Sequence, residues 1–380
     1  MQVTRREALG GIAAAAIAAP AWASEAIGPS LDVLARRKGL RFGAAITDGP
    51  EGSARDALND PRYREVVAYE CGVLVPTNEL KWTTIHETGF DQWAFARADR
   101  IVDFAEANAM GVRGHTLLWT HPDYTSKWLK EYDFGPQPRA AAEKMLVEHI
   151  AQTCGRYGER ITSWDVINEG IDHVTGQLRA NPIGNAIGLV ETMDLAFRAA
   201  RTAAPAADLV YNDYMSWARN DGIHRTAVLK LLEGFRKRGV PVDTLGIQSH
   251  IGDPHSDKTS PFGVYEEKPW RDFLDEVTGM GYKLHITEMD VGDKRLPADI
   301  PSRDRACADL AKAWLDILCS YPALRDILFW CIVDKYSWLR GLTPRADGEL
   351  KRPLPYDDDF RPKPMRKAIA DALIAAPVRQ

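Results

Sequence analysis

Two glutamates close apolar runs of this chain: Glu169 ends "SWDVINE", and Glu288 lies in "KLHITEMD". A carboxylate at the end of a buried strand must be desolvated, paired or used in chemistry. Two opposed carboxylates are what hydrolysis of a glycosidic bond needs, because one protonates the leaving oxygen while the other attacks or stabilises the anomeric carbon. Their pKa values must then be pushed apart, so that one group is protonated while the other is charged.

The neighbours of the two glutamates suggest which of them takes which part. Glu288 has partners suited to the ionised form: His250, Asp290 and the amides of Asn168 and Gln248. Glu169, beside Trp164, suits the proton donor. Strict alternation would put Asn168 and Glu169 on opposite faces of their strand, so a bulge or the turn at Gly170 must re-aim one of them.

Eight short apolar runs recur at intervals of roughly 30 to 50 residues, and they must position these groups. The runs are "LRFGAAI", "GVLVPTN", "GVRGHTLLW", "SWDVINE", "ADLVYND", "TLGIQSH", "KLHITEMD" and "DILFWCI". The gaps contain helical patterns, for example at 95–109 and around 225–235. Strands alternating with helices in this number predict an α/β fold, a single (β/α)8 barrel. A doubly wound sheet is the alternative, but no Gly-rich phosphate turn follows Ile46.

Polar and aromatic residues stand at the carboxyl ends of most of these runs. A barrel gathers its strand ends on one face, where its active site forms. We therefore expect one bowl lined by residues scattered over some 250 positions: Asn78, His115, Trp119, Asn168, Glu169, Asn212, Asp213, Gln248, His250, Glu288, Asp290 and Trp330.

The amino-acid composition limits the classes of molecule that the protein is expected to bind. The chain has 380 residues, 27% of them charged, with a net charge of −5 and no long basic run, which disfavours nucleic acid and anionic membranes. Eleven Trp and twelve Tyr suit a neutral ring-shaped ligand. The five cysteines have no metal-ligand spacing, and we expect them to be buried thiols; we predict no metal, no cofactor and a monomer.

The first 23 residues have the features of an export signal rather than of a folded element. Arg5-Arg6 precedes a short apolar run, and Ala21-Trp22-Ala23 fits a small-x-small cleavage site. The twin arginine favours the export route for folded proteins, with the general secretory route as the alternative. We expect residues 1–23 to be a signal peptide, residues 30–376 to be the catalytic barrel, and the mature protein to be periplasmic or extracellular.

Seven segments together resemble glycoside hydrolase family 10, the retaining endo-β-1,4-xylanases. They are "NELKW", "GHTLLW", "WDVINE", "YNDY", "QSH", "ITEMD" and "FWCIVDKYSWL". The resemblance implies that Glu169 is the general acid/base and Glu288 the nucleophile. It also implies sugar-binding roles for Asn78, Lys81, His115, Trp119, Asn168, Gln248, His250, Trp330 and Trp338, with Asp290 and Tyr214 supporting them.

Two positions depart from the family pattern. Thr77 stands where the second-strand motif usually has Glu, and Pro122 stands where the third-strand motif usually has Gln. Glu79 should not replace the missing carboxylate, because alternation points it to the other face. Both losses affect the glycone side, so the preferred glycan or chain length is expected to differ while the hydrolytic step survives.

The activity that these features imply is endo-1,4-β-xylanase. Cleavage of another β-1,4-glycan, or of short oligosaccharides, is the nearest alternative. A catalytically weak carbohydrate-binding protein would have lost a carboxylate, whereas both are present. A metal-dependent hydrolase on the same fold would typically carry His-x-His on its first strand, and "LRFGAAI" has no histidine.

Overall fold

A computed structural model describes residues 27–53, 55–119, 121–252, 262–342 and 344–379. The proposed signal segment, residues 1–23, lies outside the described residues. No helix in the described part of the chain is both long and apolar enough to cross a membrane.

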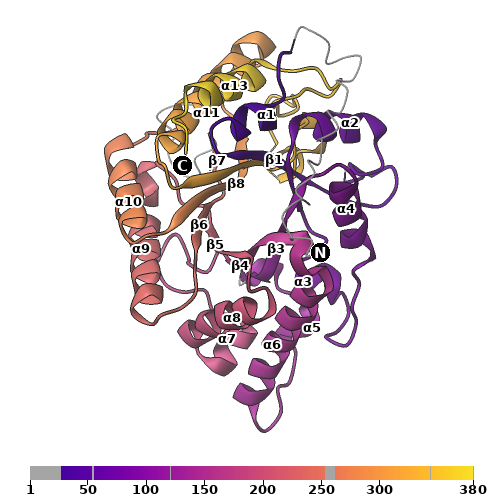
Figure 1. Ribbon diagram of the computed structural model, residues 1–380, viewed down its shortest axis with the longest axis vertical. Coiled ribbons are helices and arrows are strands. Elements are labelled where there is room, and N and C mark those ends of the chain that lie inside the picture. Colours follow the sequence, from indigo (N-terminus) through magenta and orange to yellow (C-terminus); the bar gives the residue numbers. More distant parts are fainter. Residues whose placement is uncertain (1–26, 54, 120, 253–261, 343, 380) are drawn as a thin grey trace, which may run out of the picture.

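Eight parallel strands close into a barrel, as the sequence predicts (Figure 1). In barrel order they are β1 (Arg41–Ile46), β2 (Val73–Pro76), β3 (Gly111–Trp119), β4 (Ile161–Asn168), β5 (Asp208–Asp213), β6 (Thr244–Ile247), β8 (Lys283–Val291) and β9 (Leu324–Phe329). Pairing of β6 with β8 and of β9 with β1 completes the ring. The sixth apolar run is interrupted after β6, and its last part forms β7 (His250–Ile251) on the outer end of β8.

Helices surround the strands on the outside of the ring (Figure 1). The longer ones are α2 (Pro61–Glu70), α4 (Ala96–Ala107), α6 (Pro138–Tyr157), α8 (Leu189–Ala203), α9 (Gly222–Lys237), α10 (Glu267–Gly279), α11 (Ile300–Cys319) and α13 (Pro364–Ala375). The shorter ones are α1 (Leu31–Arg36), α3 (Trp82–Ile85), α5 (Lys127–Lys130), α7 (Pro182–Ile187) and α12 (Leu339–Leu342). Proline opens α2, α6 and α13, where its fixed φ suits the first turn and no donor is lost.

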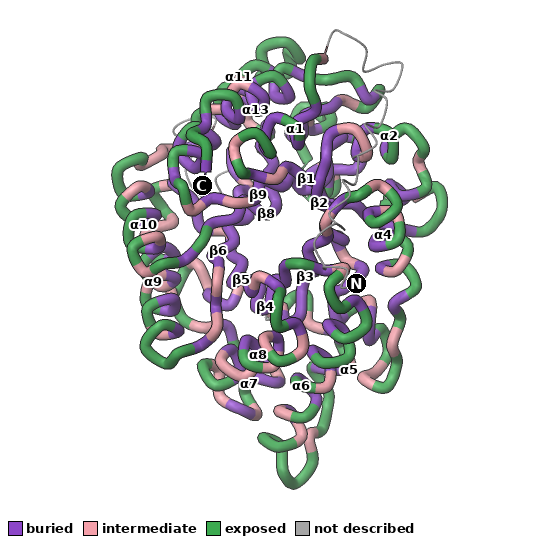
Figure 2. The backbone as a smooth tube through the Cα atoms, viewed as in Figure 1, coloured by how far each residue is buried: buried purple, intermediate pink, exposed green. Residues whose placement is uncertain are grey.

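The barrel wall is buried along nearly its whole length, whereas the outer faces of the helices are exposed (Figure 2). On one side of the interior, Ala45, Val73, Val75 and Leu328 form a small apolar cluster below Trp330. On the other side Arg113 pairs with Asp165, both fully buried. A second buried carboxylate, that of Asp326 on β9, pairs with Arg41 on β1, so apolar and charged side chains share the strands below the site.

All five cysteines are buried and carry free thiols, as expected from their spacing. The residues are Cys71, Cys154, Cys307, Cys319 and Cys331. None of them stabilises the barrel through a disulfide, so its stability rests on packing and on buried ion pairs.

Candidate active site

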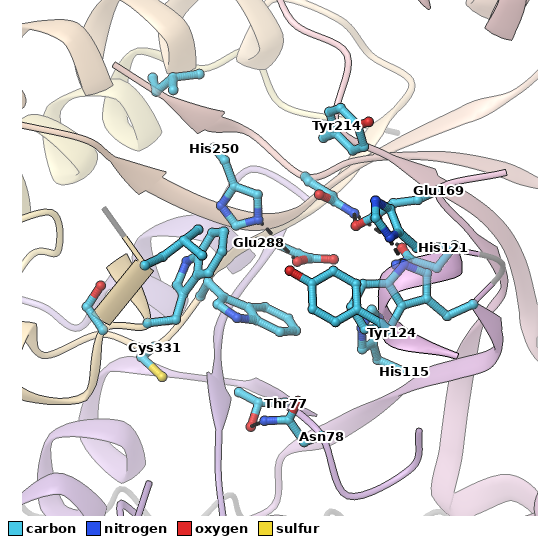
Figure 3. A pocket seen from close by; sticks show the side chains of 18 of the residues that line it. Thr77, Asn78, His115, His121, Tyr124, Glu169, Tyr214, His250, Glu288 and Cys331 are labelled. Atoms are coloured by element: carbon cyan, nitrogen blue, oxygen red, sulfur yellow. Dashed lines mark hydrogen bonds and ion pairs between the residues drawn. The ribbon is translucent and has the colours of Figure 1, made fainter. Parts of the chain in front are cut away.

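A cleft of about 1180 Å³ opens at the carboxyl ends of the barrel strands (Figure 3). It is lined by all eleven side chains named above as catalytic or sugar-binding candidates: Asn78, Lys81, His115, Trp119, Asn168, Glu169, Gln248, His250, Glu288, Trp330 and Trp338. Tyr214 also lines it, at the border, while Asp290 lies behind the wall and acts through its neighbours. Residues that are up to 260 positions apart in sequence therefore meet in one bowl.

Glu288, on β8, is 5% exposed and has two polar partners. The Asn212 amide donates to its Oε1 at 2.7 Å, and His250 Nε2 lies 3.3 Å from its Oε2. Burial alone would raise the pKa of this carboxyl, but the His250 hydrogen bond and the electrostatic attraction of His115, His250 and Lys81 lower the pKa to about 2. Glu288 is therefore ionised at neutral pH.

The structure corrects part of the expectation for Glu288. Asn168 and Gln248 were expected to hold its carboxylate, but the amide that does so is that of Asn212, at the end of β5. Asp290 also acts indirectly, since its Oδ2 lies 3.0 Å from His250 Nδ1 and accepts the Trp338 indole N–H at 2.8 Å.

His250 lies between two carboxylates, those of Glu288 and Asp290. Burial works against its charged form, but the two acids outweigh burial and raise the pKa of His250 to about 10. His250 is therefore an imidazolium at neutral pH, with a hydrogen bond from Nε2 to Glu288 and an ion pair with Asp290 on the Nδ1 side. Asp290 fixes the orientation of the ring, and through it the position of Glu288.

Glu169 follows the last residue of β4 and has a left-handed backbone, with φ +53°. Its N–H donates to the Asn212 carbonyl at 2.8 Å. This turn re-aims its side chain, so Asn168 and Glu169 both line the cleft despite strand alternation, as predicted.

Two donors orient the Glu169 carboxylate. The Trp119 indole N–H reaches Oε2 at 2.9 Å and the Gln248 amide reaches Oε1 at 2.9 Å. The expectation that Trp164 would lie beside Glu169 is wrong: Trp164 is fully buried, and its ring fills the space that a Cβ on Gly114 would take. The indole that reaches the carboxylate comes from β3 instead.

A relay of amides connects the two glutamates. Asn168 Oδ1 accepts from Gln248 at 3.2 Å and from Asn212 at 2.8 Å, and these two amides bind Glu169 and Glu288 respectively. Asn212 was visible in the sequence as a polar strand end, but nothing in its spacing assigned it to Glu288. The relay fixes the relative orientation of the two carboxyl groups without a direct contact between them.

Two further non-glycine residues at barrel strand ends have left-handed backbones. They are Ser249, between β6 and β7, with φ +65°, and Cys331, after β9, with φ +71°. Such conformations are unfavourable for residues that carry a Cβ. Together with Glu169 they put three unfavourable backbone positions around one cleft.

Lys81 and Trp119 form the edge of the cleft on the β2–β3 side. The Lys81 ammonium donates to Asn78 Oδ1 at 3.1 Å and lies 4.5 Å from the centre of the Trp119 ring. Burial lowers the pKa of Lys81, although the charges of Glu288 and Glu169 oppose that effect. Tyr124 stacks on Trp119 with ring centres 4.4 Å apart. Tyr124 was not predicted from the sequence, because it lies in a short 3₁₀ turn outside any strand-end pattern.

His115 and two tryptophans form another part of the cleft wall, next to Lys81, whose ammonium lies 5.8 Å from the centre of the Trp330 ring. His115 Nδ1 lies 2.9 Å from Asp165 Oδ2, so the buried Arg113–Asp165 pair also orients this histidine. Its ring meets the Trp330 ring edge-on at 5.3 Å. Trp338 is 39% exposed and offers an apolar face to a bound molecule.

The two departures from the family pattern differ in their consequences. Thr77 lines the cleft, whereas Pro122 starts a short 3₁₀ turn, Pro122–Tyr124, and is absent from the described lining. Glu79 does point away, as predicted: its carboxylate accepts from Thr47 Oγ1 at 3.0 Å and from the Asp48 N–H at 2.9 Å. No carboxylate therefore replaces the one that Thr77 lacks.

The described residues contain no group of three or more His, Cys, Asp or Glu side chains arranged to hold a metal ion. The cleft contains the carboxyl groups of Glu169 and Glu288, each held by side-chain hydrogen bonds.

Similarity to known proteins covers nearly the whole described chain. The model of the family described as "Glycosyl hydrolase family 10" matches residues 30–372. "Endo-1,4-beta-xylanase B" of Thermotoga neapolitana is 29% identical over 344 residues, which are 90% of this chain and 91% of that protein. "Beta-1,4-xylanase" of Dictyoglomus thermophilum is 31% identical over 321 residues, or 82% and 85% of the two chains.

Solved structures agree in fold. Native xylanase 10B from Thermotoga maritima superposes with a TM-score of 0.78 at 30% identity, covering 90% of this chain and 98% of its own. Xylanase 10B from Thermotoga petrophila in complex with xylobiose gives the same TM-score and identity, covering 90% and 97%.

Proposed function

The chain belongs to glycosyl hydrolase family 10, and on this premise we propose that it is a retaining endo-1,4-β-xylanase with Glu288 as nucleophile and Glu169 as general acid/base. The observation that carries the proposal is the contrast between the two carboxyl groups. Glu288 is kept ionised by His250 and Asn212, whereas Glu169 is held at the cleft by Trp119 and Gln248.

In the first step the ionised Glu288 attacks the anomeric carbon, and the bond to the leaving oxygen breaks. Glu169 gives its proton to that oxygen, so the leaving sugar departs as a neutral alcohol. In the second step Glu169, now charged, removes a proton from water, and the water oxygen displaces Glu288 from the anomeric carbon. The carboxyl groups of such a pair stand roughly 5–5.5 Å apart.

The remaining lining residues are proposed to bind the substrate. Asn78, Lys81, His115, Asn168, Gln248 and His250 supply hydrogen bonds to sugar hydroxyls, and Trp119, Trp330 and Trp338 supply ring faces. Asp290 supports His250 and Trp338, while Tyr214 marks the border on the leaving-group side.

The proposal is tested by incubating the purified protein with a panel of β-glycans and identifying the products. We expect internal cleavage of xylan into short xylo-oligosaccharides whose new reducing ends first appear as the β-anomer by proton NMR. An initial α-anomer would contradict the retaining mechanism. Cleavage of another glycan in preference to xylan would contradict the assigned substrate.

Restoring the carboxylate that the family pattern has at position 77 is expected to raise activity on linear neutral substrates. Thr77→Glu places an acceptor for sugar hydroxyls beside Lys81, and a charged hydrogen bond contributes about 1.5–3 kcal/mol. We expect kcat/KM on linear xylo-oligosaccharides to rise about tenfold. Pro122→Gln is the matched control, since Pro122 is absent from the described lining, and it should change little. A larger effect from Pro122→Gln than from Thr77→Glu would contradict this reasoning.

We also propose that the protein is exported through its first 23 residues and that the mature form is a monomer acting on polysaccharide outside the cytoplasm. The motive for export is the Arg5-Arg6 pair, the short apolar run and the Ala21-x-Ala23 site. Arg5→Lys with Arg6→Lys should trap activity in the cytoplasmic fraction if the twin-arginine route is used. Undiminished export of this variant would indicate the general secretory route, and N-terminal sequencing that finds Met1 would contradict cleavage.

A further inference from the structure

The charged residues of the cleft are separated by sector. The lining Lys and Arg residues that the structure describes are Arg55, Lys81, Lys335 and Arg340. They all follow β1, β2 or β9, which are neighbours in the barrel. Apart from the two catalytic glutamates, the described lining acids are Asp123 and Asp221, which follow β3 and β5. The β2–β1–β9 sector is thus positive.

This sector lies on the side of the glycone, the part of the substrate that becomes bonded to Glu288. Glu169, which protonates the leaving sugar, follows β4, and the leaving sugar must extend past it toward β5 and Tyr214. The glycone therefore extends the other way, over Lys81, Thr77 and the loop after β1. That loop is where Arg55 enters the cleft.

Two of the four cations are already paired. Lys335 forms an ion pair with Asp60 at 3.0 Å, and Arg340 forms one with Asp358 at 2.8 Å. Lys81 faces the catalytic carboxylates. Arg55 differs from these: its side chain is exposed, and no described acidic residue forms an ion pair with it.

In the described residues 47–53 and 55–58, which follow β1, hydrogen bonds hold the Arg55 backbone in place. The Leu58 N–H donates to the Thr47 carbonyl at 3.0 Å, and the Gly49 N–H donates to the Arg55 carbonyl at 2.6 Å. A Cβ on Gly49 would lie 2.3 Å from that same carbonyl oxygen, so only glycine permits this closure. Asp56 adds a hydrogen bond from the Gly52 N–H at 2.6 Å. An arginine whose backbone is held by hydrogen bonds binds a ligand more favourably than one on a mobile loop, because less conformational entropy is lost on binding.

Two acids described on this side already have other partners: Asp48 pairs with Arg100, and Asp56 accepts from the Gly52 N–H and the Asn59 amide. Thr77 stands at the position of the family's usual carboxylate, and Glu79 is turned away, with Arg97 3.6 Å from its Oε1. A neutral sugar hydroxyl would leave the Arg55 charge without a counter-ion. A carboxylate on the sugar would match it, because the planar guanidinium binds a carboxylate through two parallel hydrogen bonds.

We propose that this sector binds an acidic branch on the glycone, a uronic acid attached to the β-1,4-linked chain, with Arg55 as the residue that binds its carboxylate. The inference rests on the proposed hydrolase function and names the substrate class that the missing carboxylate and the unpaired arginine favour together. The small, neutral Thr77 side chain leaves space for such a branch and keeps the local electrostatic potential positive. A glutamate at this position would repel the branch.

The test uses three substrates: a linear xylo-oligosaccharide, the same oligosaccharide with one glucuronic acid branch, and the branched compound as its methyl ester. The ester keeps the size of the branch and removes its charge. We expect the parent enzyme to show a kcat/KM on the acidic compound several-fold above that on the ester. The branch should appear in the product that carries the new reducing end.

Arg55→Ala is expected to lower the acid-to-ester ratio about tenfold, and Arg55→Lys should lower it less, since a lysine keeps the charge without the fork. Thr77→Glu should lower the ratio as well. Sodium chloride at 0.5 M should reduce the parent's ratio, because the arginine is exposed and its charge is screened (a Debye length of roughly 4 Å). Arg64→Ala, an exposed arginine on α2 outside the cleft lining, is the matched control and should keep the parent's ratio.

The possible results of this experiment distinguish failure of the acidic-branch proposal from failure of the proposed hydrolase function. Hydrolysis of all three substrates with equal kcat/KM on acid and ester would overturn the inference and leave the hydrolase function in place. A preference for the acid that survives both Arg55 variants would overturn the assignment of Arg55. Absence of hydrolysis on every one of the three substrates would instead overturn the proposed function.

Discussion

Glu288→Ala is expected to reduce kcat by roughly 10⁴-fold or more on every substrate, because the substitution removes the carboxylate that forms the covalent bond to the anomeric carbon. The loss of activity should not depend on the leaving group, because without Glu288 the bond to the anomeric carbon cannot form, however readily the leaving group departs. Steady-state rates on a linear xylo-oligosaccharide and on an aryl xyloside with an activated phenol measure this directly.

The matched control for this substitution is Glu267→Ala, an exposed glutamate in the first turn of α10. It should retain the parent's rate, and both variants should show the parent's far-ultraviolet circular dichroism. A Glu288→Ala enzyme that keeps more than about a hundredth of the parent's kcat would remove Glu288 from the nucleophilic role.

Glu169→Ala is expected to behave differently, and the difference identifies the acid/base. A proton donor contributes typically 10²–10⁴-fold, so kcat on substrates with sugar leaving groups should fall by about that factor. An activated phenol departs without a proton, and the first step on such a substrate should be nearly as fast as in the parent. The second step then becomes limiting, because no base removes the proton from water.

Added azide tests the second step, since azide attacks the glycosyl-enzyme without base assistance. We expect azide to restore turnover of Glu169→Ala on the activated substrate and to yield a β-glycosyl azide, with no such rescue of Glu288→Ala. Equal losses in the two variants on all leaving groups, with no rescue of either, would contradict the assignment of roles.

The barrel was predictable from the sequence because its strands are continuous apolar runs at regular intervals, and the site was predictable because barrel strands end on one face. All eight runs form the expected strands, and most of the strand-end residues from Asn78 to Trp330 meet in one cleft. The expectation that Asn212, Asp213 and Asp290 also line the cleft is wrong: they are buried behind the lining, where they form hydrogen bonds to Glu288, Tyr214 and Trp338 respectively. The left-handed backbone of Ser249 was not predictable, because nothing in the polar sequence Gln248-Ser249-His250 after the apolar part of the run indicates which residue adopts it.

The hydrogen-bond partners within the site were harder to predict than the list of residues that line it. Three amides at the ends of β4, β5 and β6 have the same chemistry, and only the three-dimensional register decides that Asn212 binds Glu288 while Gln248 binds Glu169. Arg55 and Tyr124 were missed for another reason. They lie on loops, where no strand or helix period indicates which way a side chain points.

The three left-handed residues around the cleft have a consequence for engineering. A non-glycine residue at such a position costs of order 1 kcal/mol or more, so glycine at Ser249 or Cys331 would relieve a conformational penalty. Directed evolution that selects for thermal stability alone would therefore favour glycine at these positions. Glycine there would also loosen the backbone that sets His250 and Trp330, their immediate chain neighbours. A substitution that raises thermal stability at these strand ends would thus disturb the geometry of the active site. Stabilising substitutions are better sought on the helices.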